Sequence, residues 1–290
     1  MMLNPEIMVK VKELELHTRK ILSGSLIGGS KTRQKGFGFD FDQLRPYQYG
    51  DDVRLIDWKS SARNFNNLLV RQYFEDRNRT IIICLDISAS VQFGSTNFLK
   101  SEIMQQVAGV LAMAGAWSSD KVGLILFSDS IEKSIPAIKG FKHVHGLLYD
   151  MFDHKPEGKG TNFEILSEYI VQHIAKQAMI FVISDFINVD IAQTFKKISY
   201  NKELIAICCN DRQEEVLSDV GLVWMQDPET GEIALVNSSG SNRSYVNKGL
   251  STRLQNQKSM FYQAQMDVLY LHNFDTIMHD VLAFFQKRML

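Results

Sequence analysis

Apolar and polar positions follow two different periods along this chain. From residue 80 onward, short and nearly continuous apolar runs alternate with segments whose apolar residues recur every three or four positions. The runs predict strands near 80–86, 122–128, 179–184, 204–209 and 267–272. The intervening segments predict helices near 97–116, 142–152, 163–176, 190–200, 245–264 and 275–288. This alternation favours an α/β fold with a mainly parallel sheet and helices on both faces.

Two segments depart from the alternation. The run "VGLILFSDSIEKSIP" predicts two strands joined by a tight turn, which supplies one antiparallel edge strand. The run "VWMQDPETGEIALV" predicts a hairpin that turns at Asp227–Gly231. We therefore expect a hairpin insertion near 211–244 within the α/β domain.

The residues before position 79 have a different pattern. Asn4 and Pro5 mark the start of a helix predicted over 4–22. Aromatic residues then alternate at positions 37, 39 and 41, and "LLVRQYF" predicts a further strand. We expect an N-terminal helix and a small β-rich extension over 1–78, followed by the α/β domain over 79–290.

Composition narrows the class of protein. The chain has 290 residues, of which 45% are hydrophobic and 22% charged, as in a globular protein with a substantial core. A formal net charge of −1 gives no reason to expect a nucleic acid partner. The longest nearly charge-free stretch, "VAGVLAMAGAW", is too short to span a bilayer, so we expect no membrane insertion and a cytoplasmic location.

Candidate chemistry lies where three predicted segments reach one edge of the sheet. The run "TIIICLDISAS" ends a strand with Asp86 and continues with Ser88 and Ser90. "GKGTNF" places Thr161 just before a helix, and "MIFVISDF" places Asp185 at the end of another strand. In an open α/β sheet, ligands bind beyond the carboxyl ends of the strands. Two carboxylates and three hydroxyls are oxygen donors that suit Mg²⁺ or Mn²⁺.

This set resembles the metal-ion-dependent adhesion site of von Willebrand factor A-type domains. The resemblance implies that Ser88, Ser90 and Thr161 supply hydroxyl ligands, while Asp86 and Asp185 act largely through water or from the second shell. It also implies that the cation keeps an open position, which an acidic side chain of a partner protein fills. The alternative is that these residues cap loops, because Asp and Ser accept backbone hydrogen bonds wherever strands end.

The segment before the first strand of the sheet resembles one particular family among proteins with this A-type fold. "FDFDQLRPYQYGDDVRLIDWKSSARNFNNLLVRQY", followed by "LDISAS", resembles a bacterial family of uncharacterised proteins with this A-type fold. Its members are typically found beside MoxR-type AAA+ ATPases, which implies such an ATPase as a partner. The charges around Trp58 have two interpretations, a structural network tying the segment to the sheet, or a partner surface. We favour the network, with Ile56 and Trp58 as core anchors, for the residues Asp51, Asp52, Arg54, Asp57, Trp58 and Arg63.

Two functions remain open on the sequence. The first is a non-enzymatic, divalent-cation-dependent interaction module, an adaptor or chaperone-like factor for an AAA+ ATPase. The second is a metal-dependent phosphoryl-transfer enzyme with Asp86 as nucleophile. That chemistry usually uses a second acid two residues later and a lysine near the phosphate, and position 88 is serine. We therefore expect no enzyme activity.

Overall fold

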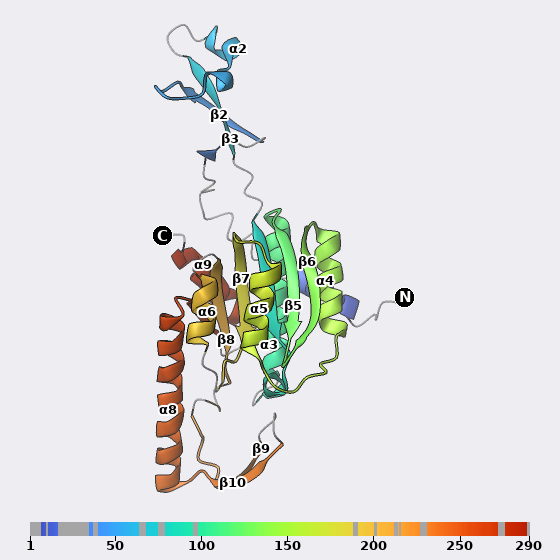
Figure 1. Cartoon of the computed structure of the whole chain (residues 1–290), viewed down its shortest axis with the longest axis vertical. Coiled ribbons are helices and arrows are strands. Elements are labelled where there is room, and N and C mark those ends of the chain that lie inside the picture. Colours follow the sequence, from blue (N-terminus) through green and yellow to red (C-terminus); the bar gives the residue numbers. More distant parts are fainter. Residues whose placement is uncertain are drawn as a thin grey trace. The chain divides into compact units, whose positions relative to one another are not determined.

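The chain divides into two compact units. The computed structural model describes residues 7–9, 11–16, 35–36, 40–63, 68–74, 79–94, 98–187, 191–199, 202–211, 214, 216–226, 231–271 and 276–288. One unit comprises Met1–Ile21 together with Arg79–Leu290, and the other comprises Leu22–Asn78. Figure 1 shows the elements of both units, and each unit is described by itself.

The larger unit is built on a six-stranded sheet. All neighbouring strands run parallel except the last pair, which is antiparallel. The order across the sheet is β11 (Asp267–Leu271), β8 (Glu203–Cys209), β7 (Ala178–Ser184), β4 (Thr80–Asp86), β5 (Lys121–Phe127) and β6 (Ile131–Lys139). The predicted α/β class, the mainly parallel sheet and the single antiparallel edge strand are all confirmed.

The order of the strands reverses beside β4. From β4 the chain adds β5 and β6 on one side, then returns to place β7, β8 and β11 on the other side. The boundary between β4 and β7 is therefore the switch point of the sheet, and connections leave it in opposite directions. Ligand crevices in open α/β sheets lie at this boundary, beyond the carboxyl ends of the strands.

Helices cover both faces of the sheet, because successive strand residues point to opposite faces. Ile81, Ile83 and Leu85 of β4 lie in one apolar core, and Ile82 and Cys84 lie in the other. The first core is closed by α3 (Lys100–Trp117), α4 (Phe141–Asp153) and α9 (Ile277–Arg288). The second is closed by α5 (Phe163–His173), α6 (Ala192–Ser199) and α8 (Gly240–Gln263). Among the helices described, none combines the length and apolarity needed to cross a bilayer.

The N-terminal helix packs in the larger unit. Its described residues, 7–9 and 11–16, are helical, and Ile7, Val11 and Leu14 lie in the first core. A Cβ at Gly109 of α3 would overlap the Leu14 side chain, so the glycine lets the two helices approach closely. The sequence grouped residues 1–78 together. The structure instead assigns Met1–Ile21 to the unit of the sheet, because this helix buries its apolar stripe there.

A separate hairpin stands outside the main sheet. Strand β9 (Leu222–Gln226) pairs antiparallel with β10 (Ile233–Asn237), within the segment expected to carry a hairpin insertion. Residues 227–230 of the expected turn lie outside the described residues. The hairpin leads directly into α8, which extends past the carboxyl edge of the sheet (Figure 1).

The smaller unit is a three-stranded antiparallel sheet. Its order is β1 (Lys35–Gly36), β3 (Leu69–Phe74) and β2 (Asp40–Pro46). A 3₁₀ turn, η1 (Val53–Leu55), and one short helix, α2 (Trp58–Ser61), lie between β2 and β3. A β-rich extension was predicted here, although residues 37–39 of the alternating aromatic stretch are outside the described residues.

The placement of the first helix predicts a stability difference between two leucines. Leu14 is 8% exposed and lies in the core, whereas Leu16 is 58% exposed. We expect Leu14→Ala to lower the free energy of unfolding by about 2–3 kcal/mol, because it leaves a cavity against α3. Leu16→Ala is the matched control and should change it by less than about 0.5 kcal/mol. Urea unfolding of the full chain measures both, and equal effects would contradict this placement of the helix.

Candidate metal centre

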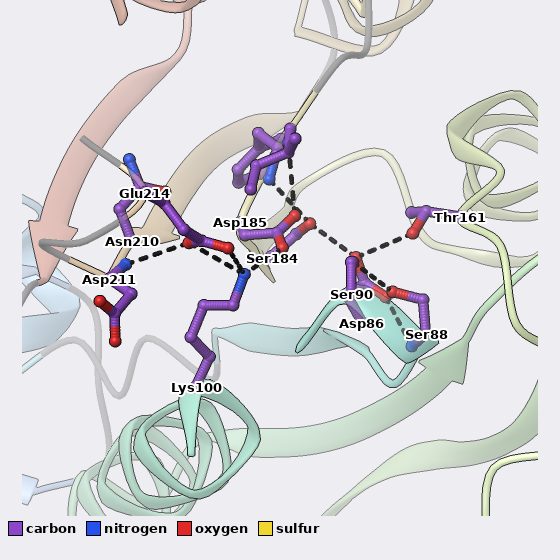
Figure 2. A network of polar contacts seen from close by, with 12 residues as sticks. Asp86, Ser88, Ser90, Lys100, Thr161, Ser184, Asp185, Asn210, Asp211 and Glu214 are labelled. Carbon is purple, nitrogen blue, oxygen red and sulfur yellow. Dashed lines mark hydrogen bonds and ion pairs between the residues drawn. The ribbon is translucent and has the colours of Figure 1, made fainter. Parts of the chain in front are cut away.

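Asp86 is held at the end of the central strand by bonds to both sides of the switch point. It is the last residue of β4 and is 1% exposed. One carboxylate oxygen, Oδ1, accepts the backbone N–H of Ser88 at 2.9 Å. The other, Oδ2, accepts the hydroxyl of Ser184, the last residue of β7, at 2.6 Å (Figure 2). The carboxylate is therefore fixed by two adjacent parallel strands.

Three of the predicted hydroxyls gather around this carboxylate. Ser88 and Ser90 leave β4 in a short 3₁₀ turn, and their Oγ atoms lie 3.1 Å apart. The Thr161 hydroxyl donates to Asp86 Oδ2 at 3.4 Å. Ser88 is fully buried, whereas Ser90 and Thr161 are partly exposed. Oxygen atoms from two distant segments thus form one group that extends from the buried strand end to the surface.

Asp185, the fifth predicted residue, lies in a neighbouring cluster. Its Oδ2 accepts the ammonium of Lys100 at 2.7 Å, and its Oδ1 accepts the backbone N–H of Ile187 at 3.3 Å. Lys100 also donates to Glu214, at 2.8 Å to Oε1. The Asp185 carboxylate therefore faces Lys100 rather than the three hydroxyls (Figure 2). The two clusters adjoin through Ser184, which precedes Asp185 and bonds to Asp86.

Sequence reasoning missed three residues of this centre, namely Lys100, Ser184 and Glu214. Lys100 begins α3 and is 2% exposed, although a lysine at a helix start is usually solvated. Ser184 was visible directly before Asp185 in "ISDF", but a serine inside an apolar run has many structural uses. Glu214 follows β8 in a segment without periodicity, so no pattern pointed to it.

Burial and charge act together on the carboxylate of Asp86. Burial, and then the negative charge of Asp185, raise its pKa from 3.8 to about 6, against the hydrogen bonds of Ser184 and Ser88. Burial also lowers the pKa of Lys100, but the charges of Asp185 and Glu214 outweigh it and the net shift is upward. Lys100 therefore stays charged, and the ionised form of Asp86 is the one that lacks a compensating cation.

The loop that carries Thr161 is fixed by the buried side chain of Glu132. This carboxylate is 3% exposed and accepts Ser128 Oγ at 2.6 Å and His154 Nε2 at 2.7 Å. It also accepts the backbone N–H groups of Glu157 and Gly158, each at 3.0 Å. Burial opposes its ionisation, but these four donors lower the pKa of Glu132. Glu132 is thus a positioning residue for the loop from α4 to Thr161.

The charged segment of the smaller unit forms local ion pairs. Asp51 accepts both guanidinium nitrogens of Arg45 at 2.7 Å, which lowers the pKa of Asp51 to about 2. Asp57 accepts Arg71 Nε at 3.0 Å and caps α2 through the Ser60 N–H. A network was predicted, and these ion pairs join residues within the smaller unit.

The other residues of that prediction have smaller or different roles. Asp52 accepts the backbone N–H of Arg54 at 2.9 Å and so caps η1, while Arg63 is exposed. Ile56 is buried, as expected of a core anchor. Trp58 is 66% exposed, so its interpretation as a core anchor was wrong.

Comparison with known families decides what kind of chain this is. The model of the family described as "Protein of unknown function DUF58" matches residues 43–255. The chain belongs to the DUF58 family. It is 27% identical over 233 residues to uncharacterized protein Rv1480 of Mycobacterium tuberculosis, covering 79% of this chain and 73% of that protein. Uncharacterized protein Mb1516 of Mycobacterium bovis matches to the same extent. The expected family of uncharacterised proteins is therefore confirmed.

The solved structures that the chain resembles are distant. Conserved hypothetical protein BatB from Bacteroides thetaiotaomicron is 13% identical, with a TM-score of 0.45 over 72% of this chain and 99% of that chain. Proximal thread matrix protein 1 from the mussel byssus, solved with a zinc-occupied MIDAS motif, is 14% identical. Its TM-score is 0.40, over 71% of this chain and 47% of that chain. At this distance the function of the DUF58 chain has to be argued from its own residues.

Removal of the Glu132 carboxylate tests whether it positions the Thr161 loop. In Glu132→Ala the Ser128 hydroxyl and two loop N–H groups lose their acceptor, and we expect a loss of about 2–4 kcal/mol in stability. Glu157→Ala, which removes an exposed carboxylate from the same loop, is the control and should cost less than about 0.5 kcal/mol. Denaturant unfolding measures the difference. Equal stability of the two variants would show that Glu132 does not hold the loop.

The raised pKa of Asp86 predicts a particular pH dependence of stability without divalent cations. Because the pKa of about 6 in the folded state exceeds the ordinary pKa of 3.8, the folded state holds the extra proton between these limits. The contribution of Asp86 is therefore fully present below pH 4 and is lost as pH rises through about 6, by at most about 3 kcal/mol. Asp86→Asn should lack this component when melts in chelator are compared from pH 4 to pH 7. Parallel profiles for the two proteins would contradict the shift.

Proposed function

We propose that this DUF58 chain binds one divalent cation, Mg²⁺ or Mn²⁺, at the carboxyl edge of its sheet and docks an acidic side chain of a partner protein on it. The charge balance carries the proposal. The carboxylates of Asp185 and Glu214 share the ammonium of Lys100, and the charge of Asp185 also acts on the nearby carboxylate of Asp86. When all are ionised, two negative charges remain uncompensated. This excess of negative charge favours the binding of a divalent cation.

The chemistry of the donors fits a hard cation. Around Asp86 the side chains of Ser88, Ser90 and Thr161 offer only oxygen, which Mg²⁺ and Mn²⁺ prefer. No group of three or more His, Cys, Asp or Glu suited to a metal occurs in the described part of the chain. Hydroxyl ligands are neutral, and a cation held mainly by them keeps the positive charge that attracts a carboxylate.

Asp185 has a different role in this proposal from that of a ligand. Its Oδ2 is held by Lys100, and both are almost completely buried. It therefore supports the cation through its negative charge, which already raises the pKa of Asp86 from a short distance. The partly exposed residues Ser90 and Thr161 leave the cation approachable from solvent on their side. A partner carboxylate would enter there.

The phosphoryl-transfer alternative gains one observation from the structure. Lys100 lies in the centre and is the residue type that such chemistry uses near a phosphate. However, its ammonium is bonded to Asp185 and Glu214, and both oxygens of Asp86 accept hydrogen bonds. No second acid stands at position 88. We therefore propose binding rather than catalysis, and hydrolysis of p-nitrophenyl phosphate that disappears in Asp86→Asn would reverse this choice.

The partner we propose is a MoxR-type AAA+ ATPase. Support comes from the resemblance carried by "YGDDVRLIDWKSSARN", a segment that lies within the DUF58 match. In this scheme the chain acts as an adaptor or chaperone-like factor, and the cation makes its docking depend on a carboxylate. The exposed Trp58 and the half-buried side chains around it add a surface for contact.

Cation binding is tested with Mn²⁺, whose free form is counted by its paramagnetic resonance signal. We expect one Mn²⁺ per chain with a dissociation constant near 1 mM, since neutral hydroxyls are weak ligands, and competition by Mg²⁺. At tenfold excess over that constant, the cation should stabilise the fold by about 1.4 kcal/mol. Ser88→Ala and Thr161→Ala should each weaken binding about tenfold or more, because each loses a ligand. Ser134→Ala, an exposed serine of β6, is the control.

The same variants test the docking step. Tagged wild-type protein in its native host should retain an AAA+ ATPase in Mg²⁺ and release it in chelator. Thr161→Ala should fail to retain it, whereas Ser134→Ala should behave as the wild type. An unchanged Mn²⁺ dissociation constant in Ser88→Ala would disprove the site. Retention of the ATPase in the presence of chelator would disprove the role of the cation.

A further inference from the structure

A second surface lies beside the candidate metal centre, along helix α8. A groove of about 970 Å³ follows one face of this helix from Tyr245 to Gln263 and is closed at one side by Phe186. Its lining recurs at intervals of three or four residues, through Gly249, Thr252, Asn256 and Met260. At about 1.5 Å per residue, this face is about 27 Å long. That length suits a polypeptide segment better than a small molecule.

The groove has a clear charge character. Helix α8 carries four basic residues and no acidic residue over its 24 positions. Lys248 and Arg253 lie on the groove, and no described residue of its lining is acidic. Arg253 donates to the backbone carbonyl of Glu214 at 2.7 Å, so its contact is to a neutral group and its charge is not compensated there. The surface is complementary to negative charge.

One buried polar atom in the groove also lacks a partner. Gln257 is 8% exposed and lines the groove. Its Nε2 donates to the backbone carbonyls of Asp185 at 3.0 Å and Phe186 at 3.2 Å. Its Oε1 is buried without a hydrogen-bond partner among the described residues. A free acceptor at this depth is satisfied by an N–H donor, such as the backbone of a bound peptide.

We propose that this groove binds an acidic segment of the partner protein, with apolar side chains against Phe186, Val246 and Met260 and carboxylates near Lys248 and Arg253. The inference rests on the proposed function, since the same partner would also place a carboxylate on the cation. Gln257 connects the groove to the candidate metal centre, because its Nε2 donates to the backbone carbonyl of Asp185. Lys248 and the cation thus select for one acidic partner at two adjacent points.

Two variants alter the groove without removing anything that holds the fold. Lys248→Glu reverses an exposed charge on the lining. At Gly249, open space surrounds the position of a Cβ, so Gly249→Leu fills the groove and also replaces a poor helix former by a good one. Lys258→Glu makes the same charge change on the same helix but outside the lining, where its ammonium lies 5.9 Å from the Tyr270 ring.

The probe is a fluorescein-labelled peptide of about 18 residues, composed of glutamate, alanine, leucine and phenylalanine, which spans the groove when helical. Fluorescence anisotropy with the full chain should show saturable binding. A peptide with glutamine at every glutamate position should bind about tenfold or more weakly, and so should Lys248→Glu and Gly249→Leu. Lys258→Glu should stay within about twofold of the wild type. Chelator should weaken binding only in part.

Each other result has a definite meaning. If the wild type does not bind the peptide, or if the groove variants bind it as well as Lys258→Glu does, the proposal that the groove binds a peptide is wrong. The Mn²⁺ measurements then still test the cation site independently. If Mn²⁺ does not bind but the peptide remains sensitive to Lys248→Glu, the groove stands and the proposed cation function fails. If a single-stranded deoxythymidine oligomer of equal charge binds more tightly than the acidic peptide, the proposed peptide ligand is wrong and the groove binds nucleic acid instead.

Discussion

The ion pairs of buried Lys100 connect the start of α3 to residues that follow strands on the other side of the switch point. The lysine comes from α3, which packs on the side of β4 and β5. Its two partners, Asp185 and Glu214, follow β7 and β8 on the other side, 85 and 114 positions away in the chain. A buried ammonium requires charged partners in good geometry, so the strand ends, the start of α3 and the segment after β8 are fixed relative to one another.

This constraint explains why the candidate cation site and the groove lie next to each other. Asp185 receives Lys100 through its carboxylate and Gln257 through its carbonyl. Glu214 receives Lys100 through its carboxylate and Arg253 through its carbonyl. The two acidic residues therefore face the strand end with their side chains and face α8 with their backbones. A partner that occupies both surfaces meets one connected framework.

The sequence predicted the sheet more fully than the site. The apolar runs predicted all five parallel strands to within about one residue, because strands buried on both faces are continuous apolar segments. Asp86, Ser88, Ser90 and Thr161 were also expected to meet, since strand ends share an edge. The Lys100 contact was not predictable, because a lysine at the start of an amphipathic helix has the same pattern whether it is solvated or paired with residues far along the chain. The prediction for Trp58 failed because of a similar ambiguity. An aromatic residue among charged residues has the same sequence pattern whether it is buried in a core or exposed on a surface.

The long separation between Lys100 and its partners has a consequence for the order of folding. A chain in which α3 has docked on β4 and β5 before β7 and β8 are in place would bury an ammonium without its carboxylates, at a cost of several kcal/mol. We therefore expect the first turn of α3 to close only after the second half of the sheet has formed. Lys100 thus makes the carboxyl edge the last part of the large unit to close, and the surface proposed for docking is completed only in the finished fold.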